Sequence, residues 1–183
     1  MQTVNVELSH AYRLLNYGPT VLVSTTDGVQ ANACAVAWVT PVSRTPPRFV
    51  LAIDPGHKTY ENLVESSECV INLPTVDAIE EVWICGSLSG HDGDKLAAAG
   101  VGVIASRRVE APRLVCAVAW IEAVLVSAPV VDGTPLVLVE AVAAEARAGV
   151  LDHQNHVDVA RFPTLHHLGG SRFALPGRIV EPA

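Results

Sequence analysis

The sequence predicts a mainly antiparallel β-barrel or β-sandwich with peripheral helices. Apolar runs of strand length dominate the chain, and two pairs of such runs are separated by Asp-Gly. Asp-Gly between apolar runs is a strong hairpin signal, because both residues tolerate the positive φ of a tight turn. The predicted helices interrupt the strands without regular alternation, which argues against the βαβ order of a Rossmann fold.

Length and composition indicate one domain spanning residues 1–183. Hydrophobic residues make up 50% of the chain and charged residues 17%, so the chain can bury a substantial core. The formal net charge of −7 argues against a broad basic face for nucleic acid. An anionic ligand would therefore need a local group of donors.

The first elements are a helix from Leu8 to Asn16 and a hairpin from Thr20 to Trp38. Asp27-Gly28 is predicted to form a type I′ turn in this hairpin. Small residues follow from Asn32 to Ala35. Two interpretations stay open: a flat ligand approaches this strand closely, or the strand packs under a helix.

The middle of the chain alternates between short elements. Prolines in the connection Pro41 to Pro47 exclude a helix or an interior strand. A short strand from Phe49 to Ile53 precedes a helix that starts near His57, and another strand covers Cys69 to Pro74. Thr75 is expected to cap a helix through Trp83.

The second half begins with a glycine-rich polar loop, Ser87 to Lys95, which leads into a short helix. Two long strands, Leu114 to Val126 and Pro135 to Ala146, flank the second Asp-Gly turn. The remaining tail is irregular until the segment FPTLHHLGGSRFALPG.

The four cysteines are widely spaced, which indicates buried thiols in a reducing compartment. The first residues lack the features of a signal peptide. The most apolar segment, Leu114 to Val131, is interrupted by Glu122 and Pro129 and is not expected to span a membrane. The expected location is the cytoplasm.

Three segments are candidates for one anion site. His57, Lys58 and Thr59 place a cation and a hydroxyl at a helix N-terminus, where free N–H groups favour a phosphate. The Ser87 to Lys95 loop adds hydroxyls, exposed amides and a second lysine. Asn32 offers an amide for a ring edge. The alternative is that Thr59 only caps its helix and that the Ser87 to Lys95 loop only connects two elements, without a role in ligand binding.

Other chemistries find little support. His153 and His156 form an H-x-x-H pair and His166 and His167 are adjacent, but neither pair has further ligands at the spacing of a zinc site. We therefore predict no metal site. No Gly-x-Ser-x-Gly elbow and no dinucleotide or P-loop glycine motif is present.

Seven motifs in order resemble the flavin reductase-like FMN-binding split-barrel family, especially its flavoredoxin branch. They are RLLNYGPTVLVST, NACAVAW, the V-S-x-x-P-P connection, KTYEN, VINLP, CGSLSG-x-D-x-D-K-L and HLGG-x-x-F. The resemblance covers most of the chain. It implies a six-stranded Greek-key barrel that forms a homodimer and binds FMN in a groove at the subunit interface.

The resemblance also implies ligand roles for particular residues, and no protein residue is expected to act as a nucleophile or acid. The isoalloxazine edge would lie against Asn32, Ala33, Cys34 and Ala35, with Trp38 beside it. The phosphate and ribityl chain would contact His57, Lys58, Thr59, Asn62, Ser87, Ser89 and Lys95.

The activity that the resemblance implies is an NAD(P)H-dependent flavin reductase, in which NADH or NADPH passes a hydride to flavin N5. Many reductases of this family carry Gly-Asp-His before the penultimate strand, whereas this chain has Asp132-Gly133-Thr134-Pro135. The alternatives are an electron carrier with tightly bound FMN and a redox partner protein, or a non-catalytic flavin-binding dimer.

Overall fold

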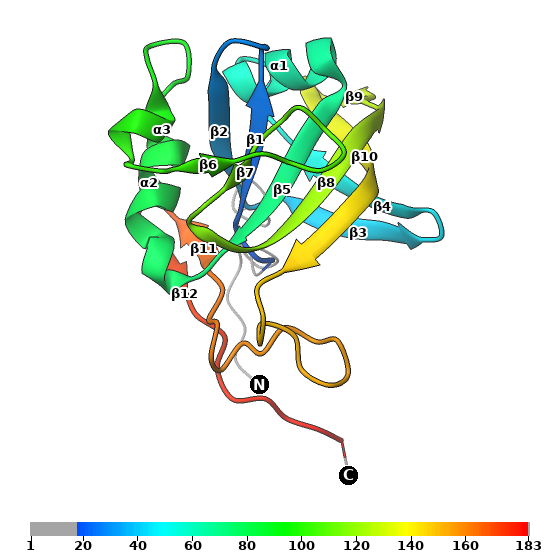
Figure 1. The fold of residues 1–183 in the computed structure, drawn as a ribbon, viewed down its shortest axis with the longest axis vertical. Helices are drawn as coiled ribbons and strands as arrows, with labels where there is room; N and C mark the ends of the chain where they lie inside the picture. Colours follow the sequence, from blue (N-terminus) through cyan, green and yellow to red (C-terminus); the bar gives the residue numbers. More distant parts are fainter. Residues whose placement is uncertain (1–17, 183) are drawn as a thin grey trace, which may run out of the picture.

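The computed structural model of the chain describes residues 18–182, so the helix expected from Leu8 to Asn16 lies outside the described residues. Most of the described chain forms one antiparallel sheet that curls around a core (Figure 1). The predicted antiparallel barrel with peripheral helices is confirmed. Within the described residues, no helix combines the length and the apolar character that crossing a membrane requires.

The sheet follows the strand order β2-β1-β5-β8-β10-β4-β3, and β9 pairs with β10. Its strands are β1 (Val21–Thr26), β2 (Ala31–Val36), β3 (Val39–Arg44), β4 (Pro47–Ala52), β5 (Glu68–Pro74), β8 (Ala117–Ser127), β9 (Val130–Val131) and β10 (Thr134–Ala146). This sheet has eight strands where six were expected, with the edge strand β3 and the two-residue β9 included. In the described chain β2 does not pair with β3, so the barrel remains split.

Helices and two short ribbons surround the sheet. The helices are α1 (Lys58–Ser66), the 3₁₀ turn η2 (Val76–Ala78), α2 (Ile79–Ser87) and α3 (Lys95–Ala98). The ribbons pair β6 (Val103–Ile104) with β7 (Arg113–Leu114) and β11 (His166–Gly169) with β12 (Arg172–Ala174). In Figure 1 the β11–β12 ribbon lies beside the lower end of α2.

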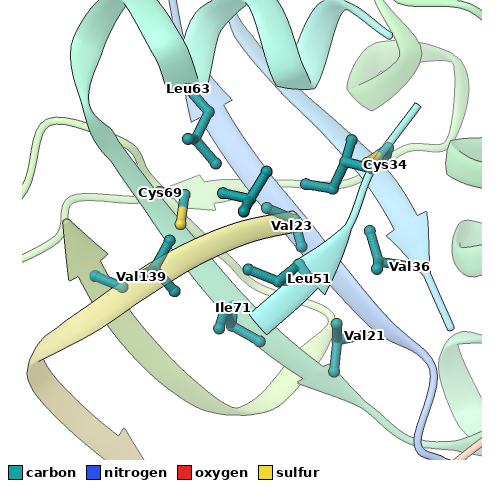
Figure 2. Close-up of a cluster of buried hydrophobic side chains, with 12 residues drawn as sticks. Val21, Val23, Cys34, Val36, Leu51, Leu63, Cys69, Ile71 and Val139 are labelled. Carbon is teal, nitrogen blue, oxygen red and sulfur yellow. The ribbon is translucent and has the colours of Figure 1, made fainter. Parts of the chain in front are cut away.

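The main core lies inside the curled sheet. Its buried side chains include Val36 of β2, at one end of the strand order, and Leu51 of β4, next to the other end, which shows that the sheet wraps around them. Figure 2 shows these side chains pointing toward one another, with Leu63 of α1 covering the open end. Burial of this apolar surface is the main stabilising contribution to the barrel.

A second core lies between β1, β2 and α2. Leu22 points away from the barrel interior and packs with Ala33 of β2 and Val82 of α2. A Cβ atom at Gly86 would lie only 3.1 Å from Cβ of Ala35, so α2 approaches β2 very closely. The small residues of β2 therefore do pack under a helix, as one of the two interpretations held.

The two Asp-Gly turns differ from each other. Asp27 does not adopt a positive φ. It begins a four-residue loop between β1 and β2, in which its carboxylate accepts a hydrogen bond from the backbone N–H of Gln30 at 2.7 Å. The prediction of a type I′ turn there is wrong, although the hairpin itself is confirmed. Asp132 and Gly133 have φ values of 48° and 82°, as a type I′ turn requires.

The proline-rich connection forms β3 at the outer end of the sheet. Pro41 lies within this strand, and the register with β4 shifts between Pro41 and Ser43. The sequence predicted a connection here and excluded a helix and an interior strand. The edge strand β3 is compatible with these two exclusions, because the outer side of an edge strand needs no hydrogen-bond donor.

A buried ion-pair cluster fastens the segment before β8 to the sheet. Glu122 of β8 is fully buried, and its carboxylate accepts hydrogen bonds from the backbone N–H groups of Arg107 and Arg108 and from Nε of Arg113 at 2.7 Å. Burial acts to raise the pKa of Glu122, but these hydrogen bonds outweigh it and hold the pKa below its ordinary value. Glu145 pairs with the same guanidinium.

We predict that Glu122→Gln lowers the free energy of unfolding by about 3 kcal/mol, because it leaves a buried guanidinium short of a counter-charge. Urea denaturation should show a lower midpoint with an unchanged slope. The contribution of Glu122 is present above the ordinary carboxyl pKa and is lost as the pH falls through the lowered pKa. As the pH is lowered, the free energy of unfolding should therefore decrease less in the Glu122→Gln variant than in the wild type. Glu65→Gln, at an exposed position of α1, is the control; equal stability of both variants would contradict the prediction.

Candidate functional site

Three adjoining cavities meet at Ala35 of β2. The strand cavity, of about 310 Å³, lies between the ends of β2 and β4 and extends to His57 and His167. The α2 cavity, of about 290 Å³, lies between β2, α2 and the β11–β12 ribbon. The loop cavity, of about 160 Å³, lies between α1 and the loop after α2. Together they form one groove along β2.

The turn before α1 places His57 where the strand cavity and the loop cavity meet. The carboxylate of Asp54 accepts a hydrogen bond from the backbone N–H of Gly56 at 2.8 Å, and the carbonyl oxygen of Asp54 accepts one from the N–H of His57. His57 is the N-cap residue of α1, but its side chain makes no capping hydrogen bond. The helix therefore begins at the groove with its first N–H groups uncapped by a side chain.

Thr59 does not cap α1, contrary to one of the two interpretations. It lies inside the first turn of the helix, is fully buried, and accepts a 2.7 Å hydrogen bond from Nδ2 of Asn32. Neither side chain lines one of the three cavities. This buried hydrogen bond instead ties β2 to α1 and so holds the two sides of the loop cavity together.

Gly90 allows the loop after α2 to fold onto β2 and α1. A Cβ atom at this position would lie 2.4 Å from Oδ1 of Asn32 and 3.0 Å from Cβ of Lys58, so a side chain does not fit without a shift. The close approach brings Ser87 and Ser89 to the wall of the loop cavity. The tight packing explains the glycine at position 90.

Lys95 is the most unusual charged residue of the groove. It lines the loop cavity but is only 6% exposed, and its Nζ donates to the carbonyl oxygen of Cys85 at 3.1 Å. No carboxylate within the described residues forms an ion pair with it. Burial lowers the pKa of Lys95 from its ordinary value. A buried ammonium group without a counter-charge favours an anionic ligand.

Lys58 is in a different electrostatic situation. Its Nζ lies 3.8 Å from a carboxylate oxygen of Asp27 and 3.6 Å from one of Glu61, and its side chain is partly exposed. Its charge is therefore already balanced within the protein. Of the two lysines at the loop cavity, Lys95 has more to gain from an anion.

Besides Asn32 and Thr59, two further residues with predicted ligand roles line none of the three cavities. Ala33 packs under α2. Asn62 is a buried residue of α1, and its Nδ2 donates a hydrogen bond to Oγ1 of Thr25 at 3.3 Å. The remaining predicted residues line the cavities: Cys34, Ala35, Trp38, His57, Lys58, Ser87, Ser89 and Lys95. Sequence reasoning missed the walls formed by Ile53 in the strand cavity and by Gly86 in the loop cavity.

The described part of the chain offers no activated thiol at the groove. Burial raises the pKa of Cys34, and it raises the pKa of Cys69 to about 12 and that of Cys85 to about 11. Such thiols carry almost no thiolate at neutral pH. Among residues 18–182, no cluster of three or more His, Cys, Asp or Glu side chains is placed to hold a metal ion.

The groove is thus cationic at one end and apolar at the other. It suits an elongated ligand with an anionic terminus near Lys95 and a flat ring near Ala35 and Trp38.

Comparison with known proteins gives a consistent result. The profile of the flavin reductase like domain matches residues 14–172. The uncharacterized protein YddH of Escherichia coli is 35% identical over 184 residues, which cover 97% of this chain and 96% of YddH.

Solved structures share the fold over their whole length. The FMN-binding domain of a flavin reductases-like enzyme from Shewanella baltica is 30% identical, with a TM-score of 0.84 and coverage of 98% of this chain and 97% of that chain. Flavoredoxin of Desulfovibrio vulgaris has a TM-score of 0.85 at 21% identity and covers 100% of this chain and 97% of its own. At that identity the likeness shows the fold alone.

Proposed function

The chain belongs to the flavin reductase-like domain family, and from this membership we propose that it is an FMN-dependent oxidoreductase. The observation that carries the proposal is the buried ammonium group of Lys95, which has no carboxylate partner in the described chain. The terminal phosphate of FMN carries a charge of about −1.5 to −2 near pH 7 and would supply the missing counter-charge.

The residues of the groove fit FMN. Lys95, Ser87 and Ser89 would hold the phosphate together with the first N–H groups of α1, and the absence of a side chain at Gly90 leaves the loop close enough to contribute its backbone. His57 would lie between the phosphate and the ring, which would occupy the strand cavity beside Ala35 and Trp38. Bound FMN would supply the hydride-accepting chemistry, while the protein orients it and limits the access of water.

We further propose NADH or NADPH as the electron donor.

A second candidate function is that of an electron carrier that receives its electrons from a protein. The turn before β10 favours this candidate. The carbonyl oxygen of Pro135 accepts a hydrogen bond from the backbone N–H of Ile53, and Ile53 lines the strand cavity. This turn therefore lies close to the proposed site of the flavin ring. The turn contains Asp132, Gly133 and Thr134 but no histidine to contact a nicotinamide.

We also propose that the protein is a homodimer. Trp38 lines the strand cavity and is 53% exposed, and Val42 on the neighbouring edge strand is 52% exposed. A second copy would cover this apolar surface and shield the ring from solvent.

The dimer can be tested by light scattering on the FMN-loaded protein over a range of concentrations. We expect a mass of twice the 19.3 kDa chain mass. A monomeric mass with FMN still bound would contradict a groove completed by a second subunit.

For FMN binding, we predict that Lys95→Met weakens affinity by about tenfold to a hundredfold, because a hydrogen bond to a charged group contributes about 1.5–3 kcal/mol. Lys58→Met makes the same change in charge but should have a smaller effect, since Asp27 and Glu61 already neutralise Lys58. Flavin fluorescence titration measures both, and thermal denaturation checks folding. Equal effects of the two variants would place the phosphate elsewhere.

The pH dependence of binding gives an independent measurement of Lys95. Because a bound phosphate favours the ammonium form, affinity should fall as the pH rises through the lowered pKa of Lys95 in the ligand-free protein. Lys95→Arg should lose this decline, since a guanidinium does not titrate in that range. Other titrating groups contribute equally to both proteins, so the difference between them isolates Lys95.

Anaerobic stopped-flow bleaching of the bound flavin tests the electron donor. The proposed reductase should be bleached rapidly by NADH or NADPH, because the bound nucleotide then lies in a reactive geometry. Slow bleaching by both nucleotides, accelerated in Thr134→His, would instead support the electron carrier. Pro135→Ala on the same turn adds no imidazole and serves as the control.

A further inference from the structure

The α2 cavity has a different chemical character from the rest of the groove. The loop cavity contains two lysines and the strand cavity contains Asp54, whereas no Asp, Glu, Lys or Arg of the described chain lines the α2 cavity. Most of its wall is apolar, with Ala35 and Ala37 on one side and Val82 on the other. A charged ligand would lose its hydration there without compensation, so the cavity selects an uncharged one.

Aromatic rings are concentrated at this cavity. The chain has only three Trp, three Tyr and three Phe, yet Trp83 and Phe173 both line the cavity, as does the imidazole of His167. The rings of His167 and Phe173 are 5.3 Å apart, tilted by 49°. At this distance the two rings pack against each other and form one aromatic wall, and Trp83 adds a further ring from α2. A planar ligand can stack or pack edge to face on these rings.

The cavity is reachable from solvent. Trp83 is 40% exposed, and Trp83 and Phe173 also line a shallower depression of about 240 Å³ next to Ile79 at the surface of α2. The depression and the cavity share these two aromatic side chains. A ligand can therefore pass between the helix and the β11–β12 ribbon, which lie side by side in Figure 1.

The position of the cavity ties it to the proposed cofactor site. It shares Ala35 with both other cavities, Ser87 with the loop cavity and His167 with the strand cavity. The buried hydroxyl of Thr20, which lines the α2 cavity, has no hydrogen-bond partner among the described residues and can serve a carbonyl or hydroxyl group of a ligand.

We propose that the α2 cavity binds a small, uncharged, planar aromatic molecule beside the FMN, and that this is the substrate class of the protein. The binding itself follows from the cavity, and only the role as substrate rests on the proposed function. At about 290 Å³ the cavity is at the small end of ligand pockets, which limits the occupant to one ring with a short substituent.

The test uses three probes and the FMN-loaded protein. Acetophenone is planar, aromatic and uncharged; benzoate keeps the ring but is charged; cyclohexyl methyl ketone keeps the ketone but is saturated. Saturation-transfer NMR and isothermal titration should show acetophenone binding several-fold more tightly than either of the others. Equal binding of all three, or no binding of acetophenone, would overturn the proposal.

Variants locate the binding. Trp83→Ala should weaken acetophenone binding about three- to tenfold, the expected loss of one aromatic contact. Trp83→Phe keeps an aromatic wall and should remain within about twofold of the wild type. An unchanged affinity in a folded Trp83→Ala variant would overturn the assignment to this cavity.

The same titrations separate this inference from the proposed function. Acetophenone binding that depends on Trp83 in protein that fails to bind FMN would support the cavity while refuting the cofactor. Acetophenone binding that FMN displaces competitively would overturn a second site, because the ring of the flavin would then occupy the α2 cavity itself.

Discussion

The site depends on how closely α2 and the loop after it approach β2. Two glycines make this approach possible: Gly86 lies against Ala35, and Gly90 lies against Asn32. A larger side chain on either side would push the helix and loop outward, since packed interiors do not absorb extra atoms without a shift. The small residues of β2 therefore pack against Gly86 of α2 and Gly90 of the loop after it. The groove lies along the outer edge of this contact.

This contact also sets the electrostatics of the groove. The loop that Gly90 brings inward continues into α3, where Lys95 becomes buried beside the loop cavity. In a chain with a formal charge of −7, a buried lysine without a carboxylate partner in the described residues is costly unless a ligand pairs with it. Lys58 sits on the opposite wall and is already paired, so the two lysines contribute differently although the sequence presents them alike.

Several elements could be predicted because local sequence determines them. The first hairpin and the two long strands follow from alternation and turn residues. The proline-bearing β3 was expected only as a connection. The errors were also local. Asp27 was expected at positive φ, but its carboxylate accepts backbone N–H groups and closes a wider loop, a choice that the dipeptide alone does not reveal.

By itself, the sequence determined the antiparallel β class, the order of the elements and the residue types at the groove, because periodicity, turn chemistry and motif order are properties of neighbouring residues. Only the tertiary structure decided which of those residues face the groove. It buried Thr59 against Asn32, paired Asn62 of α1 with Thr25 of β1 and left Lys95 without a counter-charge among the described residues. These outcomes depend on contacts between segments dozens of residues apart, and burial and charge pairing are set by those contacts rather than by the residues alone.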